Sequence, residues 1–247
     1  MPLSPKTAKR IAIVAVLLGV GGAGAGAFLA MRGPDPAYMP EMVAVAEVGG
    51  KPLWVARREV SLAEWNRCYD EGGCTQHLRP PTFDKGEDWP ATNLSYADVS
   101  EYLAWISEKA RHRFRLMTAE EWSELAAPVM PEKPDPIFTD PSLTWASTYL
   151  VENLVDRRLR PRGSWAETTE GVQDLNGNVW EWTQDCYQSG TTPEACPAFV
   201  VQGEHEAVIP FLVRDPARGG CAVGAPPPHL GMRLATEKRV PDALLFH

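Results

Sequence analysis

The stretch that decides the fold of this chain reads Asp174-Leu175-Asn176-Gly177-Asn178-Val179-Trp180-Glu181-Trp182. Asn176-Gly177 is typical of a tight turn, because both residues tolerate a positive φ. From Val179 onward the alternation of side chains predicts a strand, with the two tryptophans on one face and Glu181 on the other. The stretch therefore predicts a turn that leads directly into a strand.

This turn carries a carboxylate at each end, Asp174 and Glu181, with backbone carbonyls between them. Hard oxygen ligands of this kind suit a calcium ion. The same spacing also fits a hairpin whose tryptophans belong to the core and whose carboxylates bind no metal. Both interpretations remain open from the spacing of the residues.

Length and charge limit the classes of protein to which the chain can belong. Its 247 residues are enough for one large domain, and its formal net charge is −8. Four basic residues and no acidic residue precede Pro34, which leaves 20 basic against 32 acidic residues in the rest of the chain. An excess of acidic residues in this part of the chain argues against nucleic acid as a partner.

The N-terminus has the pattern of an export signal. Three basic residues precede the uncharged run Ile11–Met31, which has about the ~20 residues that cross a bilayer as a helix. One interpretation is a cleaved signal peptide with a small-residue site near Ala25 and Ala27. The other is an uncleaved signal anchor, which the full length of the run favours.

The domain organisation follows from this pattern. We expect a signal peptide or signal-anchor helix over residues 1–33, a proline-rich linker over 34–41 and a folded domain over 42–247. The protein would then lie in the bacterial inner membrane, held through residues 11–31, with its domain facing the periplasm. Cleavage would release the same domain into the periplasm.

Three capping boxes predict the starts of three helices. They are Ser61-Leu-Ala-Glu64, Ser95-Tyr-Ala-Asp98 and Thr118-Ala-Glu-Glu121. Strands are expected over 42–48, 53–55, 114–116 and 211–213, while 184–210 is expected to be irregular and the tail after Ala235 loose.

Five cysteines need an assignment. In an exported protein, Cys68 with Cys74 and Cys186 with Cys196 are plausible local disulfides, which leaves Cys221 over. A zinc site is disfavoured, because no Cys-x-x-Cys occurs and the histidines are scattered.

The organising stretch also resembles a known family signature. Gly171–Trp182 is similar to the G-L-Y-D-M-H-G-N-V-W-E-W motif of the formylglycine-generating enzymes, the sulfatase-modifying factors. Further blocks follow the family order: Glu59–Ser61, Arg115–Ala127, Pro161–Trp165, Arg218–Gly220 and Gly231–Arg233. The resemblance implies a single α/β (α+β) domain of low regular secondary structure, related to C-type lectins.

The resemblance also bears on activity. Family enzymes bind copper through two cysteines just after the block that Arg218–Gly220 resembles, and a thiolate pair is what Cu(I) prefers. Here Gly224 stands at the first cysteine position, the second is absent, and Cys221 falls on the family's serine. Copper and a formylglycine-generating activity are therefore not expected, and Cys221 is only a weak catalytic candidate.

The calcium site of the family is matched more completely in this sequence than the copper site. A family calcium site uses positions that match Asp174, Gly177, Val179 and Glu181, so the resemblance implies a structural calcium ion at these four residues.

Three functions are compatible with these features. The favoured hypothesis is a membrane-tethered, non-catalytic accessory or maturation protein for an envelope redox enzyme or other client protein, as some exported family members are. The first alternative is a copper- and oxygen-dependent oxidoreductase that uses Cys221. The second is a lectin-like ligand-binding module.

Overall fold

Capping boxes begin the three α-helices of the described chain, as the sequence predicts. The computed structural model describes residues 33–48, 50–81, 86, 88–132, 137, 140, 143, 146, 150, 158–188, 190–215 and 227–246. Its helices are α2 (Leu62–Asp70), α3 (Tyr96–Lys109) and α4 (Ala119–Ala126). In each box the side chain of the N-cap residue and the acidic side chain three residues later satisfy each other's backbone N–H groups.

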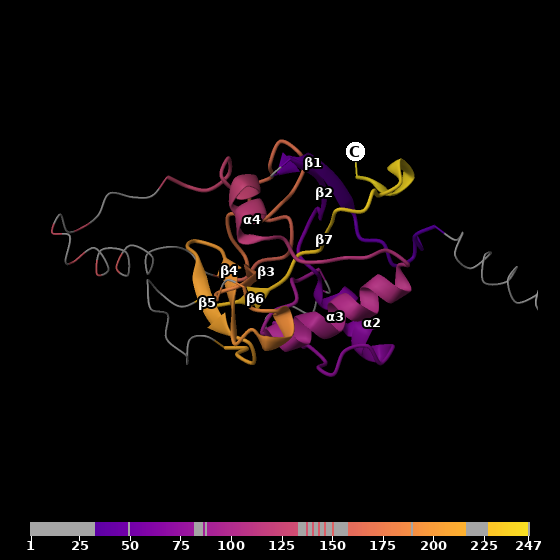
Figure 1. Ribbon diagram of the computed structural model, residues 1–247, viewed down its shortest axis with the longest axis horizontal. Helices are drawn as coiled ribbons and strands as arrows, with labels where there is room; N and C mark the ends of the chain where they lie inside the picture. The colour runs from indigo at the N-terminus through magenta and orange to yellow at the C-terminus, as the bar shows by residue number, and fades with distance from the viewer. Residues whose placement is uncertain are drawn as a thin grey trace, which may run out of the picture.

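Two small sheets complete a mixed α/β domain. The first has the strand order β1-β2-β7, with β1 at Met42–Val48, β2 at Lys51–Ala56 and β7 at Ala235–Thr236. The second has the order β5-β4-β3-β6, with β3 at Trp180–Cys186, β4 at Ala198–Gln202, β5 at Ala207–Pro210 and β6 at Leu230–Gly231. All paired strands are antiparallel except β3 and β6. Figure 1 shows α4 beside the second sheet, where it contacts β3 and β4, while α2 and α3 pack on each other.

Tryptophans form much of the core, and two of them also donate hydrogen bonds to backbone carbonyls of neighbouring loops. Trp65 and Trp182 are almost fully buried. The indole N–H of Trp65 donates to the Gln76 carbonyl at 2.8 Å, and that of Trp182 donates to the Leu94 carbonyl at 2.8 Å. A buried indole keeps its hydrogen bond in this way, so the same side chains fill the core and fix the loops beside it.

The organising turn is not the hairpin that its Asn-Gly dipeptide suggests. Positive φ angles occur at Asp174 and Asn178, both at 69°, and not at Asn176 or Gly177. Short polar side chains tolerate this conformation. Gly177 is required for another reason, because an added Cβ would lie 2.4 Å from the ring of Trp165. The strand after the turn pairs with β4 and β6 rather than with the segment just before the turn.

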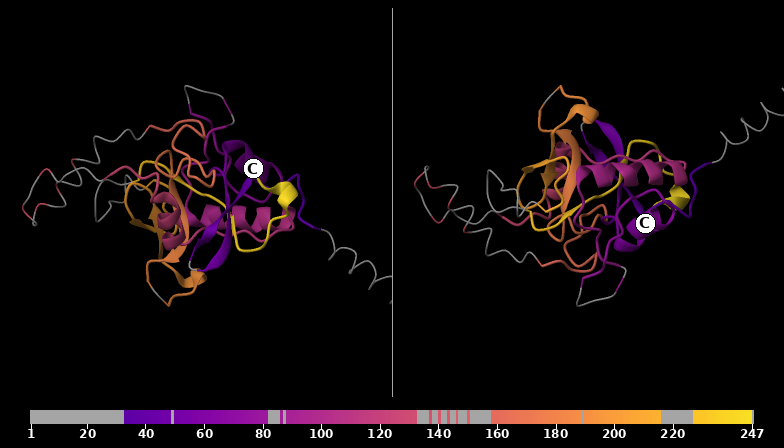
Figure 2. Two further views of the ribbon diagram at one scale, coloured as in Figure 1. Left: turned by 90° about the horizontal axis from the view of Figure 1, so that it is seen from above. Right: turned by 90° about the horizontal axis from the view of Figure 1, so that it is seen from below.

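Four further expectations are wrong. The span 184–210 contains β4 and β5, and every residue of β4 is buried, as in a strand covered on both faces. Residues 114–116 make only an isolated bridge to β7, and 211–213 form a turn. The tail is held, because Leu245 pairs with Met42 and the N–H of Phe246 donates to the Met42 carbonyl at 2.8 Å. Both views of Figure 2 show this C-terminal segment beside the start of the described chain.

The predicted export segment lies outside the described residues. Among those that are described, no helix is long and apolar enough to cross a bilayer.

Candidate functional site

A buried ion pair ties the organising turn to the C-terminal part of the chain. Parallel pairing of β3 with β6 sets Glu181 opposite Gly231, two residues before Arg233. The guanidinium of Arg233 donates from Nε and Nη2 to Oε1 of Glu181, at 2.9 and 2.7 Å. The other carboxylate oxygen, Oε2, accepts the indole N–H of Trp122 at 3.0 Å. A bidentate pair with satisfied oxygens is the arrangement that makes buried charges tolerable.

Asp174 anchors the other end of the turn. Its carboxylate accepts the backbone N–H of Trp165 at 2.9 Å and that of Gly163 through its second oxygen. The side chain of Asn176 in turn accepts the N–H of Ala166 at 3.0 Å. The turn is closed by a hydrogen bond from the Gly177 N–H to the Asp174 carbonyl at 3.2 Å, and its side chains hold it against the segment 163–166.

Glu59 completes the buried cluster. Its Oε1 accepts the side-chain amide of Asn178 at 3.3 Å, while its buried Oε2 has no hydrogen-bond partner among the described residues. Burial raises the pKa of Glu59 to about 8, Arg233 opposes that shift, and the carboxylates of Asp174 and Glu181 add to it. Glu59 is therefore mostly protonated at neutral pH, which reduces the charge enclosed around Arg233.

Of the four expected calcium positions, the two that would supply carboxylates, Asp174 and Glu181, are already engaged by other groups. Arg233 and Trp122 occupy both oxygens of Glu181, and backbone N–H groups occupy both oxygens of Asp174. Within the described residues, no group of three or more histidine, cysteine, aspartate or glutamate side chains could hold a metal ion as placed. As arranged here, these residues do not fit a calcium cage, and calcium at the turn stays a prediction.

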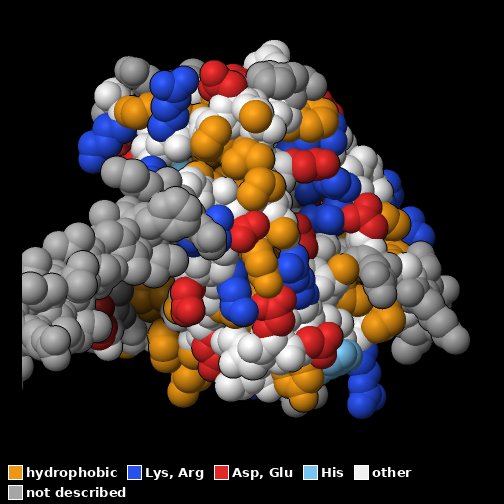
Figure 3. All heavy atoms as spheres, turned by 90° about the vertical axis from the view of Figure 1, so that its right-hand side faces the viewer, with side chains coloured by type: hydrophobic (Ala, Val, Ile, Leu, Met, Phe, Trp, Pro, Cys, Tyr) orange, Lys and Arg blue, Asp and Glu red, His pale blue; other side chains and the backbone are white. Residues whose placement is uncertain are grey.

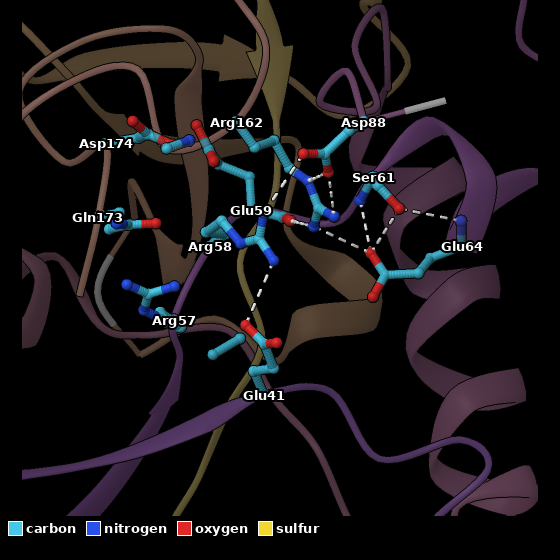
Figure 4. Close-up of polar contacts among 12 residues, drawn as sticks. Glu41, Arg57, Arg58, Glu59, Ser61, Glu64, Asp88, Arg162, Gln173 and Asp174 are labelled. Atoms are coloured by element: carbon cyan, nitrogen blue, oxygen red, sulfur yellow. Dashed lines mark hydrogen bonds and ion pairs between the residues drawn. The ribbon is translucent and has the colours of Figure 1, made fainter. Parts of the chain in front are cut away.

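A second polar network lies beside the turn (Figure 4). The guanidinium of Arg162 donates to Asp88 at 2.8 Å and to the backbone carbonyl of Glu59 at 2.6 Å. Asp88 also lies 3.4 Å from Arg58, which reaches Glu41 at 3.3 Å. In the figure the carboxylate of Glu59 points away from these arginines and towards Asp174. The network thus fixes Arg162 against Asp88 and against the residues that precede α2.

Next to this network the surface opens into a cleft of about 920 Å³. Leu62, Leu78 and Trp89 belong to its apolar lining and are themselves nearly buried. Concave sites of this size, apolar with a few polar groups, are typical of ligand-binding sites.

The loop 75–79 forms one wall of the cleft and is held at several points. The side-chain amide of Asn66 makes two hydrogen bonds to the backbone of Leu78, each 3.0 Å long. The N–H of Thr75 donates to the Glu101 carboxylate at 2.9 Å. The disulfide Cys68–Cys74 joins the start of this loop to α2. These constraints order the wall before any ligand arrives, which reduces the entropic cost of binding.

The remaining walls are also attached to the core. Trp89 pairs with Leu62 through a backbone hydrogen bond of 2.7 Å. The N–H of Arg160 donates to the Asn178 side chain at 3.0 Å, which links this wall to the organising turn. His229 lines the cleft directly before β6, and its carbonyl accepts the N–H of Trp180 at 2.9 Å.

The cysteines are distributed as the sequence predicts where they are described. Cys68–Cys74 and Cys186–Cys196 form disulfides, with S–S distances of 2.04 and 2.02 Å. Cys221 lies outside the described residues. The two bridges use four of the five cysteines in the chain, so a single cysteine is left that could provide a thiolate.

Sequence reasoning missed both the cleft and the buried ion pair. Gln76, Arg79 and Trp89 fall in a loop that was distinguished only by its prolines, and no local pattern placed that loop beside Arg158 or His229. The buried cluster did leave a signal, since Glu59, Glu181 and Arg233 each belong to a block of the family resemblance.

Comparison with known proteins gives a consistent result. The sequence profile described as the sulfatase-modifying factor enzyme 1-like domain matches residues 14–238. No curated protein sequence matches the chain.

The chain is also similar to several solved structures. PvdO from Pseudomonas aeruginosa has a TM-score of 0.50 and 18% identity, with 78% of this chain and 89% of that one covered. CarF has a TM-score of 0.47 and 14% identity, covering 81% and 97%. Treponema denticola variable protein 1 has a TM-score of 0.48 and 12% identity, covering 84% and 94%.

Proposed function

Since this chain belongs to the sulfatase-modifying factor enzyme 1-like domain family, we propose that it is a non-catalytic accessory protein of that family. In this proposal it binds an envelope client, such as a redox enzyme under maturation, in the cleft beside α2. A signal anchor over residues 11–31 tethers it to the inner membrane, with the domain on the periplasmic side.

The number of available thiols carries the proposal. The family's oxidation chemistry needs two thiolates on one copper ion, and four of the five cysteines here are closed in disulfides. Cys221 alone cannot supply such a pair. Two local disulfides also suit an oxidising compartment such as the periplasm.

The position and order of the cleft support a binding role. His229 lines it, and this residue ends the segment in which family enzymes carry their copper cysteines. The cleft therefore lies near the place where the family's chemistry would occur. Its walls are fixed by the disulfide and by hydrogen bonds to the core, so the chain keeps an ordered cleft without the catalytic thiols.

Site-specific crosslinking in living cells tests this function. A photoreactive amino acid at Thr92, a half-buried residue of the cleft, should give one discrete adduct whose partner mass spectrometry identifies as an envelope protein. The same probe at the exposed Lys238 should not give that adduct. Equal adducts at both positions, none at Thr92, or a cytoplasmic partner would contradict the proposal.

Fractionation of the same cells tests the tether. We expect the full-length chain in the inner-membrane fraction, with its domain accessible to protease added to spheroplasts. A cytoplasmic location would contradict this part of the proposal.

A further inference from the structure

The segment 33–40, which follows the predicted signal anchor, is bound to the end of α3. The N–H of Asp35 donates to the carbonyl of Ala110, directly after that helix, at 2.8 Å, and the Asp35 carboxylate pairs with Arg111 at 2.9 Å. Arg111 also donates from Nε to the carbonyl of Gly33 at 3.1 Å. The chain is therefore held at the C-terminal end of α3 from Gly33, the first described residue, onward.

The end of α2 holds the same segment through Tyr38. The Tyr38 hydroxyl donates to Glu71 at 3.0 Å, and the ring packs edge-on against Trp105 with 5.8 Å between the centroids. The guanidinium of Arg67 lies over the same ring, 3.7 Å from its centroid, and donates to the Ala37 carbonyl at 2.8 Å. Contacts from two helices thus fix the path of the chain where it enters the domain.

The proposed tether brings this docked segment close to the bilayer. The uncharged run ends at Met31, two residues before Gly33. Two residues span at most about 7 Å, and the headgroup layer on one side of a bilayer is roughly 5–8 Å thick. Gly33 therefore lies in the headgroup layer or at its surface when residues 11–31 span the membrane.

Two exposed cations, Arg113 and Lys238, lie at this end of the domain. Arg113 follows Arg111 by two residues, and the hydroxyl of Thr236 donates to the Arg113 carbonyl at 2.8 Å, which brings the segment 236–238 beside it. Neither cation forms an ion pair with a carboxylate of the described residues. Figure 3 shows the side of the molecule on which the described chain begins, with basic, acidic and hydrophobic side chains interspersed.

The charge of the whole chain favours contact with lipid through these cations. The formal net charge is −8, and an anionic bilayer surface repels acidic side chains while it attracts nearby lysine and arginine. Lipid phosphates also accept hydrogen bonds from a guanidinium group. The favoured orientation is therefore the one in which Arg113 and Lys238 face the headgroups.

The cleft lies at the opposite end of the same helices. Its lining includes Leu62, the first residue of α2, and Asn93, two residues before the N-cap Ser95 of α3. The 14 residues of α3 extend over roughly 20 Å. In Figure 1 the helix α3 runs towards the side on which the described chain begins. The cleft and the docked segment are thus separated by about the length of α3.

From these contacts, and resting on the proposed tether, we infer that the C-terminal end of α3 is the membrane-facing surface of the domain. Arg113 and Lys238 contact the phosphates of anionic lipid headgroups there. The docked segment 33–40 holds the cleft on the far side, roughly 20 Å from the headgroups. The client is therefore bound from the periplasm and not from within the bilayer.

Quenching of a fluorescent probe by lipids tests the inference on the full-length, disulfide-bonded protein. The protein is reconstituted in vesicles of phosphatidylethanolamine and phosphatidylglycerol that contain a lipid with a spin label on its headgroup. A fluorescent amino acid at Arg113 should lose most of its emission, and the same probe at Arg79 should keep it. The two positions are matched, because both arginines are exposed and Arg79 lines the cleft. Equal quenching at both positions, or stronger quenching at Arg79, would overturn the inference.

Charge reversal tests the assigned contacts. With the probe at Arg239, which is exposed and adjacent to Lys238, the double variant Arg113→Glu, Lys238→Glu should lose most of the quenching. Arg79→Glu is the control and should leave the quenching unchanged. All the substituted residues are exposed, so the fold should survive, and an unchanged melting temperature checks this. Undiminished quenching in the double variant would overturn the inference.

Failure of the tether is distinguishable from failure of this orientation. Protein that does not float with the vesicles contradicts the signal anchor of the proposed function. Protein that floats with them while the probe at Arg113 keeps its emission contradicts only the membrane-facing surface inferred here.

Discussion

Arg233 and Glu181 form an ion pair at 2.7 Å in which the side chains are only 0% and 2% exposed. The pair joins β3 to the segment directly after β6, and 52 residues separate its members in the sequence. Arg233 also donates to the backbone carbonyls of Ala56, Arg57 and Gln173. One guanidinium thus connects β2, the organising turn and β3.

Removal of this guanidinium should destabilise the domain strongly. Arg233→Met leaves the Glu181 carboxylate buried without its cation, which costs roughly 3–5 kcal/mol in comparable buried pairs. Urea unfolding measures the change in the free energy of unfolding. Arg239→Met is the control, since its side chain is 77% exposed, and it should change stability by less than about 0.5 kcal/mol. Similar effects of the two substitutions would show that the buried pair is not a major support of the fold.

The raised pKa of Glu59 predicts a characteristic pH dependence of stability. Its pKa is about 8 in the folded protein and 4.5 ordinarily, because of burial and the nearby Asp174 and Glu181. Between these values the folded state binds more protons than the unfolded state. The contribution of Glu59 to the free energy of unfolding is therefore fully present below pH 4.5 and is lost as the pH rises towards 8. The loss is at most roughly 1.4 kcal/mol per pH unit.

Glu59→Gln isolates this contribution, since the amide keeps the shape of the side chain and does not titrate. Urea unfolding at a series of pH values from about 5 to about 8 should show a shallower fall of stability in the variant than in the unmodified protein. Parallel curves for the two proteins would mean that Glu59 does not hold its proton in the folded state.

The two disulfides should stabilise the folded domain, and Cys68–Cys74 should also hold one wall of the cleft in place. Each closes a short loop, with sequence separations of 6 and 10, and a bridge of this kind contributes roughly 2–3 kcal/mol. Peptide mapping without reductant should recover Cys68 joined to Cys74 and Cys186 joined to Cys196. Replacement of Cys68 and Cys74 by alanine should also weaken the crosslink from Thr92, because the wall over 75–79 loses a constraint. A bridge from Cys221 to any of these four would contradict the assignment.

The family resemblance and the geometry of the organising turn lead to opposite expectations for the effect of calcium on stability. The family resemblance predicts that calcium raises the melting temperature and that a chelator lowers it, because an ion that binds only the folded state stabilises it. Arg233 and Trp122 already donate hydrogen bonds to both carboxylate oxygens of Glu181, which predicts that the melting temperature does not depend on calcium. The geometry favours this second result. Differential scanning calorimetry with calcium and with chelator decides between them. A calcium-induced rise that Glu181→Gln abolishes would establish the metal site.

Local features were predictable from the sequence, and distant contacts were not. The capping boxes at Ser61, Ser95 and Thr118 depend on residues three apart, so their helices begin where the sequence places them. The same holds for the two disulfides. The buried cluster depends on contacts across the fold: 119 residues separate Asn178 from Glu59, and no periodicity reports such a contact. The cleft likewise combines residues as distant as Leu62 and His229.

Strand pairing shows the same limit. β4 is apolar from Ala198 to Val201 and packs on both faces, so it lacks the alternation by which strands are recognised. The turn was misjudged because Gly177 is required by the approach of Trp165, a contact that lies outside the turn itself.

The central claim is that this domain binds without performing the family's oxidation. Its most direct test is an assay of the full-length, disulfide-bonded protein with a Cys-x-Pro-x-Arg peptide, copper and oxygen, beside an active family enzyme as positive control. The account predicts that mass spectrometry finds the peptide cysteine unchanged, while the control enzyme converts it to formylglycine. Copper-dependent conversion by this protein that is lost in Cys221→Ser would contradict the account and make Cys221 a catalytic residue.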